Sequence, residues 1–372
     1  MSICYVCGCT ITKSNTYREH IILNSIGGKI ISSSIICKSC APRFDVVDKV
    51  LSQQLNFVGL MLNIKRDRGT NPHIKATITE TGEDIFISSG GKPVQIKPII
   101  EKNQSDASIS ITARDKKQMR EFIEGLKRKE TFIDDTEVIL NNAKIIEDYL
   151  DKPVCNQLQI GGKEFFRAIC KMILSFYMHN GGNREQILHL IRYIKDGNQQ
   201  DIVWYYYPNN VECSSKEPIQ ILHRLIVKAN STEKLMYGYV ELFSTFKFLV
   251  LMSKNYIGED FYKSYCFDVL SRTEIESSIN LSLSKEEVIK IVEIKENKVD
   301  EFKGALNKLM KFIHQKQIDD CITNMVKKNV DTCFQGLTEG SVISDEIIIK
   351  LIDNLSEESA KFMYSKSQSY NK

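Results

Sequence analysis

Residues 4–40 have the sequence CYVCGCTITKSNTYREHIILNSIGGKIISSSIICKSC. The segment begins with the pair Cys4 and Cys7 and ends with the pair Cys37 and Cys40, each pair spaced as Cys-x-x-Cys. Four thiolates at this spacing are typical of a tetrahedral structural zinc site. A metal that closes such a loop also stabilises a segment too small to form its own core. A redox role is the alternative for one Cys-x-x-Cys pair, but two pairs favour zinc.

The composition is that of a folded protein with more than one domain. The chain has 372 residues, of which 42% are hydrophobic and 26% charged, so we expect two or three folded units. Eleven cysteines, an odd number, do not suggest a disulfide scaffold, and we interpret Cys9 as a bystander to the zinc site. We expect no membrane span and no secretory signal, and therefore a cytoplasmic protein.

The charge is unevenly distributed. The whole chain has a net charge of +3, but residues 1–75 contain ten basic and four acidic residues, a net charge of +6. A basic head on a near-neutral body indicates a polyanionic partner, with a solvated lysine-rich surface as the alternative.

The hydrophobic pattern predicts two strands followed by a helix at the N-terminus. Paired isoleucines at residues 21–22 and 30–31 flank Gly27-Gly28, as in a hairpin. Pro42 suits the first turn of a helix, and apolar residues then recur at helical spacing as far as Ile64.

The remaining chain alternates between strand and helix patterns. We expect strands within 73–112, 202–207, 219–227 and 236–251. We expect helices at 114–129, 163–179, 184–195, 284–335 and 343–366.

Between the two cysteine pairs lies the dipeptide Glu19-His20, followed by Ile21-Ile22. In this context it resembles the HNH endonuclease superfamily, the ββα-metal nucleases, and specifically a bacterial branch with zinc knuckles around a Glu-His-Ile-Ile core. The segment 24–29 (NSIGGK), Phe44 and Asp48 also carry the resemblance. It is strong over residues 1–75 and fades beyond them.

The resemblance implies a nuclease mechanism. His20 would be the general base that deprotonates water, and Glu19 the first ligand of a catalytic Mg²⁺ or Mn²⁺. Neighbours on a regular strand point to opposite faces, so a kink or bulge is expected to bring Glu19 and His20 into a common site. Ser34 is the candidate for the polar residue that supports the general base.

The sequence departs from the family pattern at Ala41. In the family, the residue after the last zinc cysteine is usually Asn or His and binds the catalytic metal. Three interpretations are open: a domain that has lost activity, another oxygen ligand, or an engineered change that inactivates the enzyme. The third is slightly favoured because the rest of the motif is intact. For the second, Asp45 and Asp48 share a helical face with residue 41 and are candidate ligands, although an Asp early in a helix also commonly stabilises the helix dipole.

Further basic residues are candidates for phosphate contacts. Lys65, Arg66 and Arg68 follow the predicted helix and have the chemistry to bind a nucleic-acid backbone. A solvated surface is the equally weighted alternative.

We therefore expect an α+β protein with four parts. These are a zinc-bound HNH nuclease domain (1–70), a connecting α+β region (71–150), an α+β domain of unknown role (151–283) and a helical region (284–372). The expected function is metal-dependent hydrolysis of phosphodiester bonds, with DNA as the expected substrate, in bacterial restriction or phage defence. A homodimer or a partner protein of a defence system is the expected assembly.

Two other functions compete with the nuclease. A zinc-dependent nucleic-acid-binding protein without catalysis is favoured by Ala41 and disfavoured by Glu19-His20. A scaffold whose zinc head contacts other proteins is only mildly disfavoured by the positive charge of the head.

Overall fold

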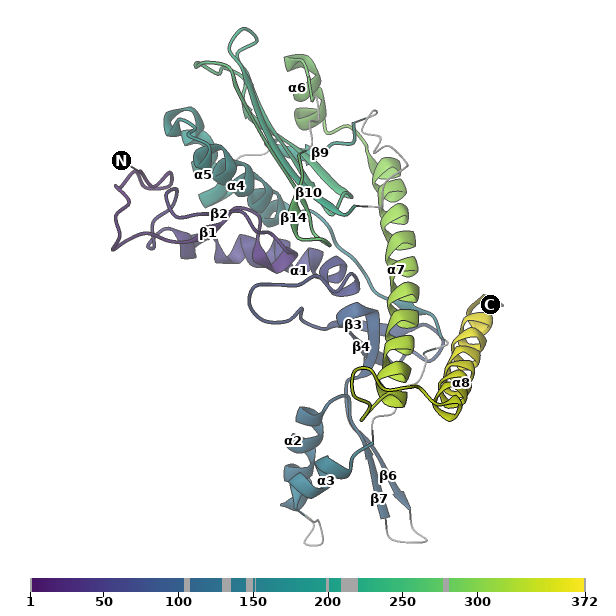
Figure 1. Cartoon of the computed structure of the whole chain (residues 1–372). Helices are drawn as coiled ribbons and strands as arrows, with labels where there is room; N and C mark the ends of the chain where they lie inside the picture. The colour runs from purple at the N-terminus through teal and green to yellow at the C-terminus, as the bar shows by residue number, and fades with distance from the viewer. Residues whose placement is uncertain are drawn as a thin grey trace. The chain divides into compact units, whose positions relative to one another are not determined.

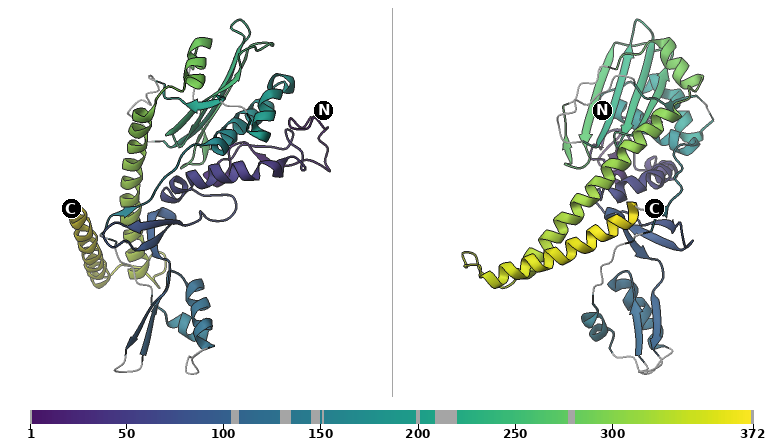
Figure 2. Two further views of the ribbon diagram at one scale, coloured as in Figure 1. Left: turned by 180° about the vertical axis from the view of Figure 1, so that it is seen from behind. Right: turned by 90° about the vertical axis from the view of Figure 1, so that its right-hand side faces the viewer.

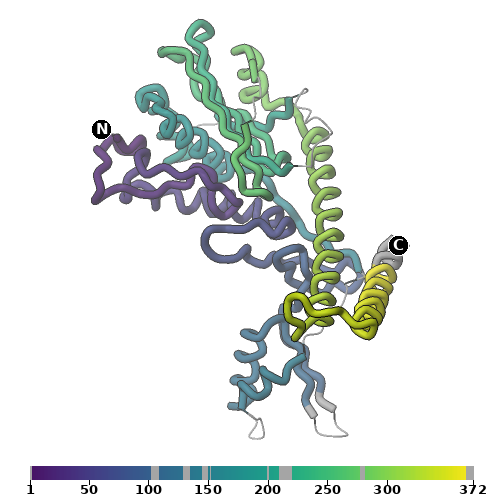
Figure 3. The backbone as a smooth tube through the Cα atoms, in the orientation of Figure 1, coloured from purple at the N-terminus to yellow at the C-terminus, as the bar shows by residue number. Residues whose placement is uncertain are grey.

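The computed structural model describes residues 2–103, 108–128, 135–144, 150, 152–198, 201–208, 220–276 and 281–370. Figure 1 labels the helices and many of the strands, and Figure 3 follows the backbone. The chain divides into two compact units. Unit 1 contains residues 1–72 and 158–316, and unit 2 contains residues 73–157 and 317–372.

Unit 1 begins with two short strands and a helix, as the sequence predicts. The elements of this head are β1 (Glu19–His20), the 3-10 turns η1 (Asn24–Ile26) and η2 (Ala41–Phe44), β2 (Ile31–Ser32) and α1 (Asp45–Met61). The strands are antiparallel, with Glu19 opposite Ser32 and His20 opposite Ile31. Pro42 lies in the first turn of η2, where its missing N–H costs no hydrogen bond.

The larger part of unit 1 is an antiparallel sheet in the order β14-β13-β10-β11-β12-β9. Its strands are β9 (Val203–Tyr205), β10 (Leu222–Asn230), β11 (Leu235–Leu242), β12 (Phe246–Ser253), β13 (Phe261–Asp268) and β14 (Thr273–Glu274). Its helices are α4 (Lys163–His179), α5 (Leu188–Asp196), preceded by η4 (Arg184–Ile187), and α6 (Lys285–Glu293).

The sheet is covered on both faces (Figures 1 and 2). Along β11, Gly238 lies against Ile173 of α4, whereas Tyr237 and Tyr239 share a core with Val288 of α6. This alternation follows from the two-residue period of a strand. Because α1 packs on α4, the layers run α1, α4, sheet and α6, and the head rests on the helix that covers the sheet.

The described part of unit 2 contains two further sheets and three helices that lie wholly within it. The sheets are β5-β4-β3-β8 and the hairpin β6-β7, with strands β3 (Ile74–Ile78), β4 (Asp84–Ser88), β5 (Lys92–Gln95), β6 (Ile99–Asn103), β7 (Ser108–Thr112) and β8 (Val154–Cys155), and the turn η3 (Ser89–Gly91). The helices are α2 (Lys116–Lys127), α3 (Thr136–Asn142) and α8 (Asp345–Tyr370). Helix α7 (Val299–Cys333) begins in unit 1 and ends in unit 2. Among the described residues, no helix is both long and apolar enough to span a membrane.

The α+β class and the predicted outline of the head are confirmed. The range 236–251 forms two strands, β11 and β12. Strands β8, β13 and β14 and helix α3 were not predicted, and residues 104–107, 129 and 219 of the predicted elements lie outside the described residues. The four-part division by sequence stays a prediction, because the two units do not test it.

Gly28 provides a test of packing in the head. A Cβ at this position would collide with the backbone carbonyl of Ile22, so we expect Gly28→Ala to lower the free energy of unfolding by about 2 kcal/mol or more. Gly304→Ala in α7 is the control, because the space around Gly304 is open and alanine favours a helix. Urea denaturation of both variants measures the difference; equal stability would contradict the packing.

Candidate active site and zinc cluster

Five cysteines gather at the N-terminal end of the head. The sulfur atoms of Cys4, Cys7, Cys9 and Cys37 all lie within 4.8 Å of one another. The Cys7 and Cys37 sulfurs are 3.8 Å apart, which is about the edge of a tetrahedron with zinc–sulfur bonds of 2.3 Å. Cys40 lies beside Cys37 and Cys7. The cluster could therefore hold zinc, and Cys9, interpreted from the sequence as a bystander, lies within it.

Two tight turns present these sulfurs. In the first turn, the Gly8 N–H donates to the Cys4 carbonyl (2.8 Å), and in the second the Ala41 N–H donates to the Cys37 carbonyl (3.1 Å). The Cys37 N–H also points at the Cys4 sulfur (3.4 Å). Burial opposes ionisation of Cys37, but hydrogen bonds from Ser39 and the Cys40 backbone lower the pKa of its thiol to about 6. A thiolate is the form that binds a metal.

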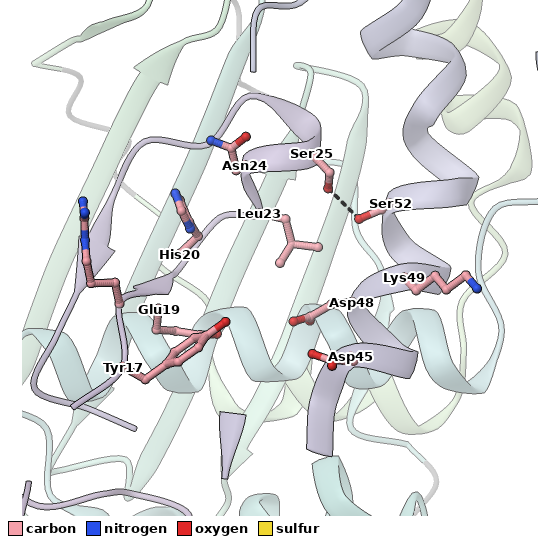
Figure 4. Close-up of a pocket in the computed structure, with 11 residues that line it drawn as sticks. Tyr17, Glu19, His20, Leu23, Asn24, Ser25, Asp45, Asp48, Lys49 and Ser52 are labelled. Atoms are coloured by element: carbon pink, nitrogen blue, oxygen red, sulfur yellow. Dashed lines mark hydrogen bonds between the residues drawn. The ribbon is translucent and has the colours of Figure 1, made fainter. Parts of the chain in front are cut away.

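A cavity of about 300 Å³ lies beside β1 and the start of α1 (Figure 4). Both polar residues of β1 line it, together with acidic and basic residues of neighbouring segments: Arg18, Glu19, His20, Asp45, Asp48 and Lys49. Figure 4 shows Glu19 and His20 leaving the strand in different directions. Both side chains nevertheless line one cavity, which residues from the first turns of α1 also line.

His20 has a free imidazole nitrogen within the described part of the chain. Its Nε2 is buried and has no hydrogen-bond partner there, and Asp67 Oδ2 is 4.0 Å away. Burial lowers the pKa of His20, and Asp67 only partly opposes this shift. The imidazole is therefore neutral at neutral pH and able to accept a proton.

Asp67 organises the surroundings of His20. It forms an ion pair with Lys29, accepts a hydrogen bond from Arg272 (3.1 Å) and donates its N–H to Asn24 Oδ1 (3.2 Å). Ser34, the residue suggested to support the base, interacts with Ser32. The loop after α1 thus provides the carboxylate next to the imidazole.

Glu19 and Asp48 share a buried lysine. The Nζ atom of Lys171, in α4, lies 2.6 Å from Glu19 Oε1 and 2.6 Å from Asp48 Oδ2. Burial alone would lower the pKa of Lys171, but the two carboxylates raise it above its usual range. Burial and the nearby Glu19 raise the pKa of Asp48, and Lys171 only partly opposes them.

Comparison with known protein families finds a match in the N-terminal segment. Residues 4–56 match a family model described as HNH endonuclease. These residues form an HNH domain. No curated protein and no solved structure matches the chain significantly.

Position 41 of the HNH domain is buried, and Ala41 is 7% exposed. The cavity beside it is lined instead by Asp45 and Asp48, one and two turns further along. Together with Glu19, they place three carboxylates around one space. Carboxylate oxygens are the ligands that a hard divalent cation prefers, but among the described residues only the cysteines bring three or more candidate ligand atoms within 4.8 Å of one another.

The three candidate phosphate-binding residues after α1 differ from one another. Arg66 donates to Asn71 Oδ1 (2.6 Å) and to Asn56 Oδ1 (3.0 Å), so its guanidinium holds the loop. Lys65 and Arg68 are exposed and available to solvent.

Several residues at the HNH site were missed by sequence reasoning. Arg18 and Lys49 line the cavity, while Asp67 and Lys171 contact its residues from distant positions. Only Lys171 carried a signal, because it is a cation in the middle of the apolar segment 163–179. The sequence of that segment does not indicate that Lys171 pairs with Glu19 and Asp48.

Cys37 and Cys9 provide a test of the zinc cluster. We expect Cys37→Ser to lose zinc and unfold the HNH domain, because metal binding and folding are coupled in such sites. Cys9→Ser should retain one zinc per chain, since four thiols remain. Metal analysis and circular dichroism check both variants, and a folded, zinc-loaded Cys37→Ser protein would contradict the assignment.

Proposed function

We propose that the protein is a metal-dependent nuclease that hydrolyses phosphodiester bonds, with DNA as its substrate. The observation that carries the proposal is that His20, whose buried Nε2 atom has no hydrogen-bond partner among the described residues, lines the same cavity as three carboxylates. A neutral base beside a cation-binding set is what hydrolysis of a phosphodiester requires.

His20 acts as the general base. Its Nε2 atom accepts a proton from a water molecule, whose oxygen attacks the phosphorus while the bond to the leaving oxygen breaks. Asp67, 4.0 Å from Nε2, favours the imidazolium that results. The lowered pKa of His20 keeps the base unprotonated before the reaction.

Glu19, Asp48 and Asp45 would hold a catalytic Mg²⁺ or Mn²⁺. When bound, this ion supplies charge stabilisation for the leaving oxygen. The cysteine cluster would hold a separate, structural zinc ion. In this proposal the acidic residues of α1 take the place of the ligand missing at Ala41.

Basic residues at the cavity are suited to the phosphates on either side of the scissile bond. Arg18 and Lys49 line the cavity, and Lys65 and Arg68 add exposed charge nearby in the sequence. The net charge of +6 over residues 1–75 supports a polyanionic partner.

A non-catalytic, zinc-dependent nucleic-acid-binding protein is the second candidate. Ala41 favours it, and so does Lys171, which already neutralises part of the charge on Glu19 and Asp48. Salt-sensitive binding of DNA without cleavage in any divalent metal would support this candidate.

The broader setting follows from the fold-level analogy alone. We propose a cytoplasmic enzyme of bacterial restriction or phage defence, acting as a homodimer or with a partner protein. A dimer would bring two HNH domains to one duplex.

His20→Ala should reduce plasmid nicking in Mg²⁺ or Mn²⁺ by about 100-fold or more, because the general base is lost. The variant should keep the zinc content and the melting temperature of the parent. His179→Ala is the matched control, since this histidine is exposed at the end of α4. Equal cleavage by His20→Ala and the parent would remove His20 from the mechanism.

The ligand role of α1 has its own test. Asp45→Asn should raise the Mg²⁺ concentration for half-maximal cleavage by about tenfold, because an anionic oxygen is lost from the site. Ala41→Asn should change cleavage by less than about threefold, since Asp45 and Asp48 already line the cavity. A large gain in activity from Ala41→Asn would show that residue 41 is the missing ligand.

A further inference from the structure

Lys171 is a buried cation in an otherwise apolar part of α4. The residue is 4% exposed, and its neighbours Ile169, Cys170, Met172 and Ile173 are buried too. A lysine in such surroundings is costly unless its charge is compensated. The reason for its presence must therefore lie in what its ammonium group contacts.

The ammonium group contacts the two carboxylates of the candidate metal site. It lies 2.6 Å from one oxygen of Glu19 and 2.6 Å from one oxygen of Asp48, with the ring of Phe44 5.6 Å away. Glu19 and Asp48 line the cavity, whereas Lys171 is not one of its lining residues. Lys171 thus approaches both carboxylates from the side of α4 and leaves the cavity side open.

The position of Lys171 is fixed by other contacts between the HNH domain and the body of unit 1. The hydroxyl groups of Tyr5 and Ser175 are 3.3 Å apart. Ser175 lies one turn after Lys171 in α4. Arg184 donates to the Tyr5 carbonyl (2.9 Å), and Gln54 exchanges two hydrogen bonds with Gly161 just before α4. The helix therefore cannot easily withdraw the ammonium group from the carboxylates.

We propose that Lys171 is a resident cation of the candidate active site. As a positioning residue, it holds the Glu19 and Asp48 carboxylates together and lowers the affinity of the cavity for divalent ions. The inference rests on the proposed function, because it assigns these two carboxylates to the metal. Physically, a fixed positive charge beside the two ligands repels a second cation, while without it the two carboxylates would repel each other.

The test is the affinity of the zinc-loaded full-length protein for Mn²⁺, measured by electron paramagnetic resonance. We expect Lys171→Met to bind Mn²⁺ at least about tenfold more tightly than the parent. Without Mn²⁺ this variant should melt at a lower temperature, and added Mn²⁺ should raise its melting temperature more than that of the parent. The reason is that Mn²⁺ then replaces the missing counter-ion.

Three further variants make the result specific. Lys163→Met, an exposed position of the same helix, should behave as the parent. Lys171→Arg should restore parental Mn²⁺ affinity, and Glu19→Gln combined with Lys171→Met should abolish the gain. If Lys171→Met does not fold, Lys171→Gln still donates a hydrogen bond to a carboxylate and should show tighter Mn²⁺ binding in the same direction.

Unchanged or weaker Mn²⁺ binding by the folded Lys171 variants would overturn the inference. Plasmid cleavage by the parent is scored separately. If the parent does not cleave DNA but Lys171→Met binds Mn²⁺ more tightly, the proposed nuclease function is wrong and the proposed role of Lys171 stands. If the parent cleaves DNA but Lys171→Met binds Mn²⁺ with unchanged affinity, the nuclease function stands and the proposed role of Lys171 is wrong.

Discussion

A buried ammonium group shared by two carboxylates ties the HNH domain to the rest of unit 1. Lys171 comes from the helix that covers the sheet, Glu19 from the first strand and Asp48 from α1. None of these charges is favourable in the interior without the others. The relative position of the three elements is therefore set by an electrostatic requirement as well as by apolar packing.

The same arrangement gives β1 two chemical faces. Because side chains alternate along a strand, Glu19 points to the ion cluster and His20 to the group around Asp67. The two side chains differ in whether their polar atoms have a partner. Glu19 is 5% exposed and forms an ion pair with Lys171, whereas the His20 imidazole has an unpartnered nitrogen among the described residues. One dipeptide thus provides both a cation-binding carboxylate and a neutral base.

The body contributes to the HNH domain at several further points. His223, fully buried in β10, interacts with the Ile26 carbonyl (2.9 Å), and burial lowers its pKa to about 4, so it is a neutral packing residue. Arg272 donates to the Lys65 carbonyl (2.6 Å) and to Asp67. These contacts hold η1, whose residues Asn24 and Ser25 line the cavity, and the loop after α1, which carries Asp67. Through these contacts the HNH domain is an integral part of unit 1 and not an independent domain.

Local sequence alone determined the cysteine spacing, the helix after Pro42, the apolar helix over 163–179 and the Glu19-His20 dipeptide, because each depends on neighbours within a few residues. The resemblance and the local pattern also predicted Glu19, His20, Asp45 and Asp48 as candidate site residues, and all four line one cavity. Tertiary structure alone decided that Lys171 meets Glu19 across about 150 positions and that Asp67 lies beside His20. Such pairings have no local signature, since burial and charge compensation act between segments that only folding brings together.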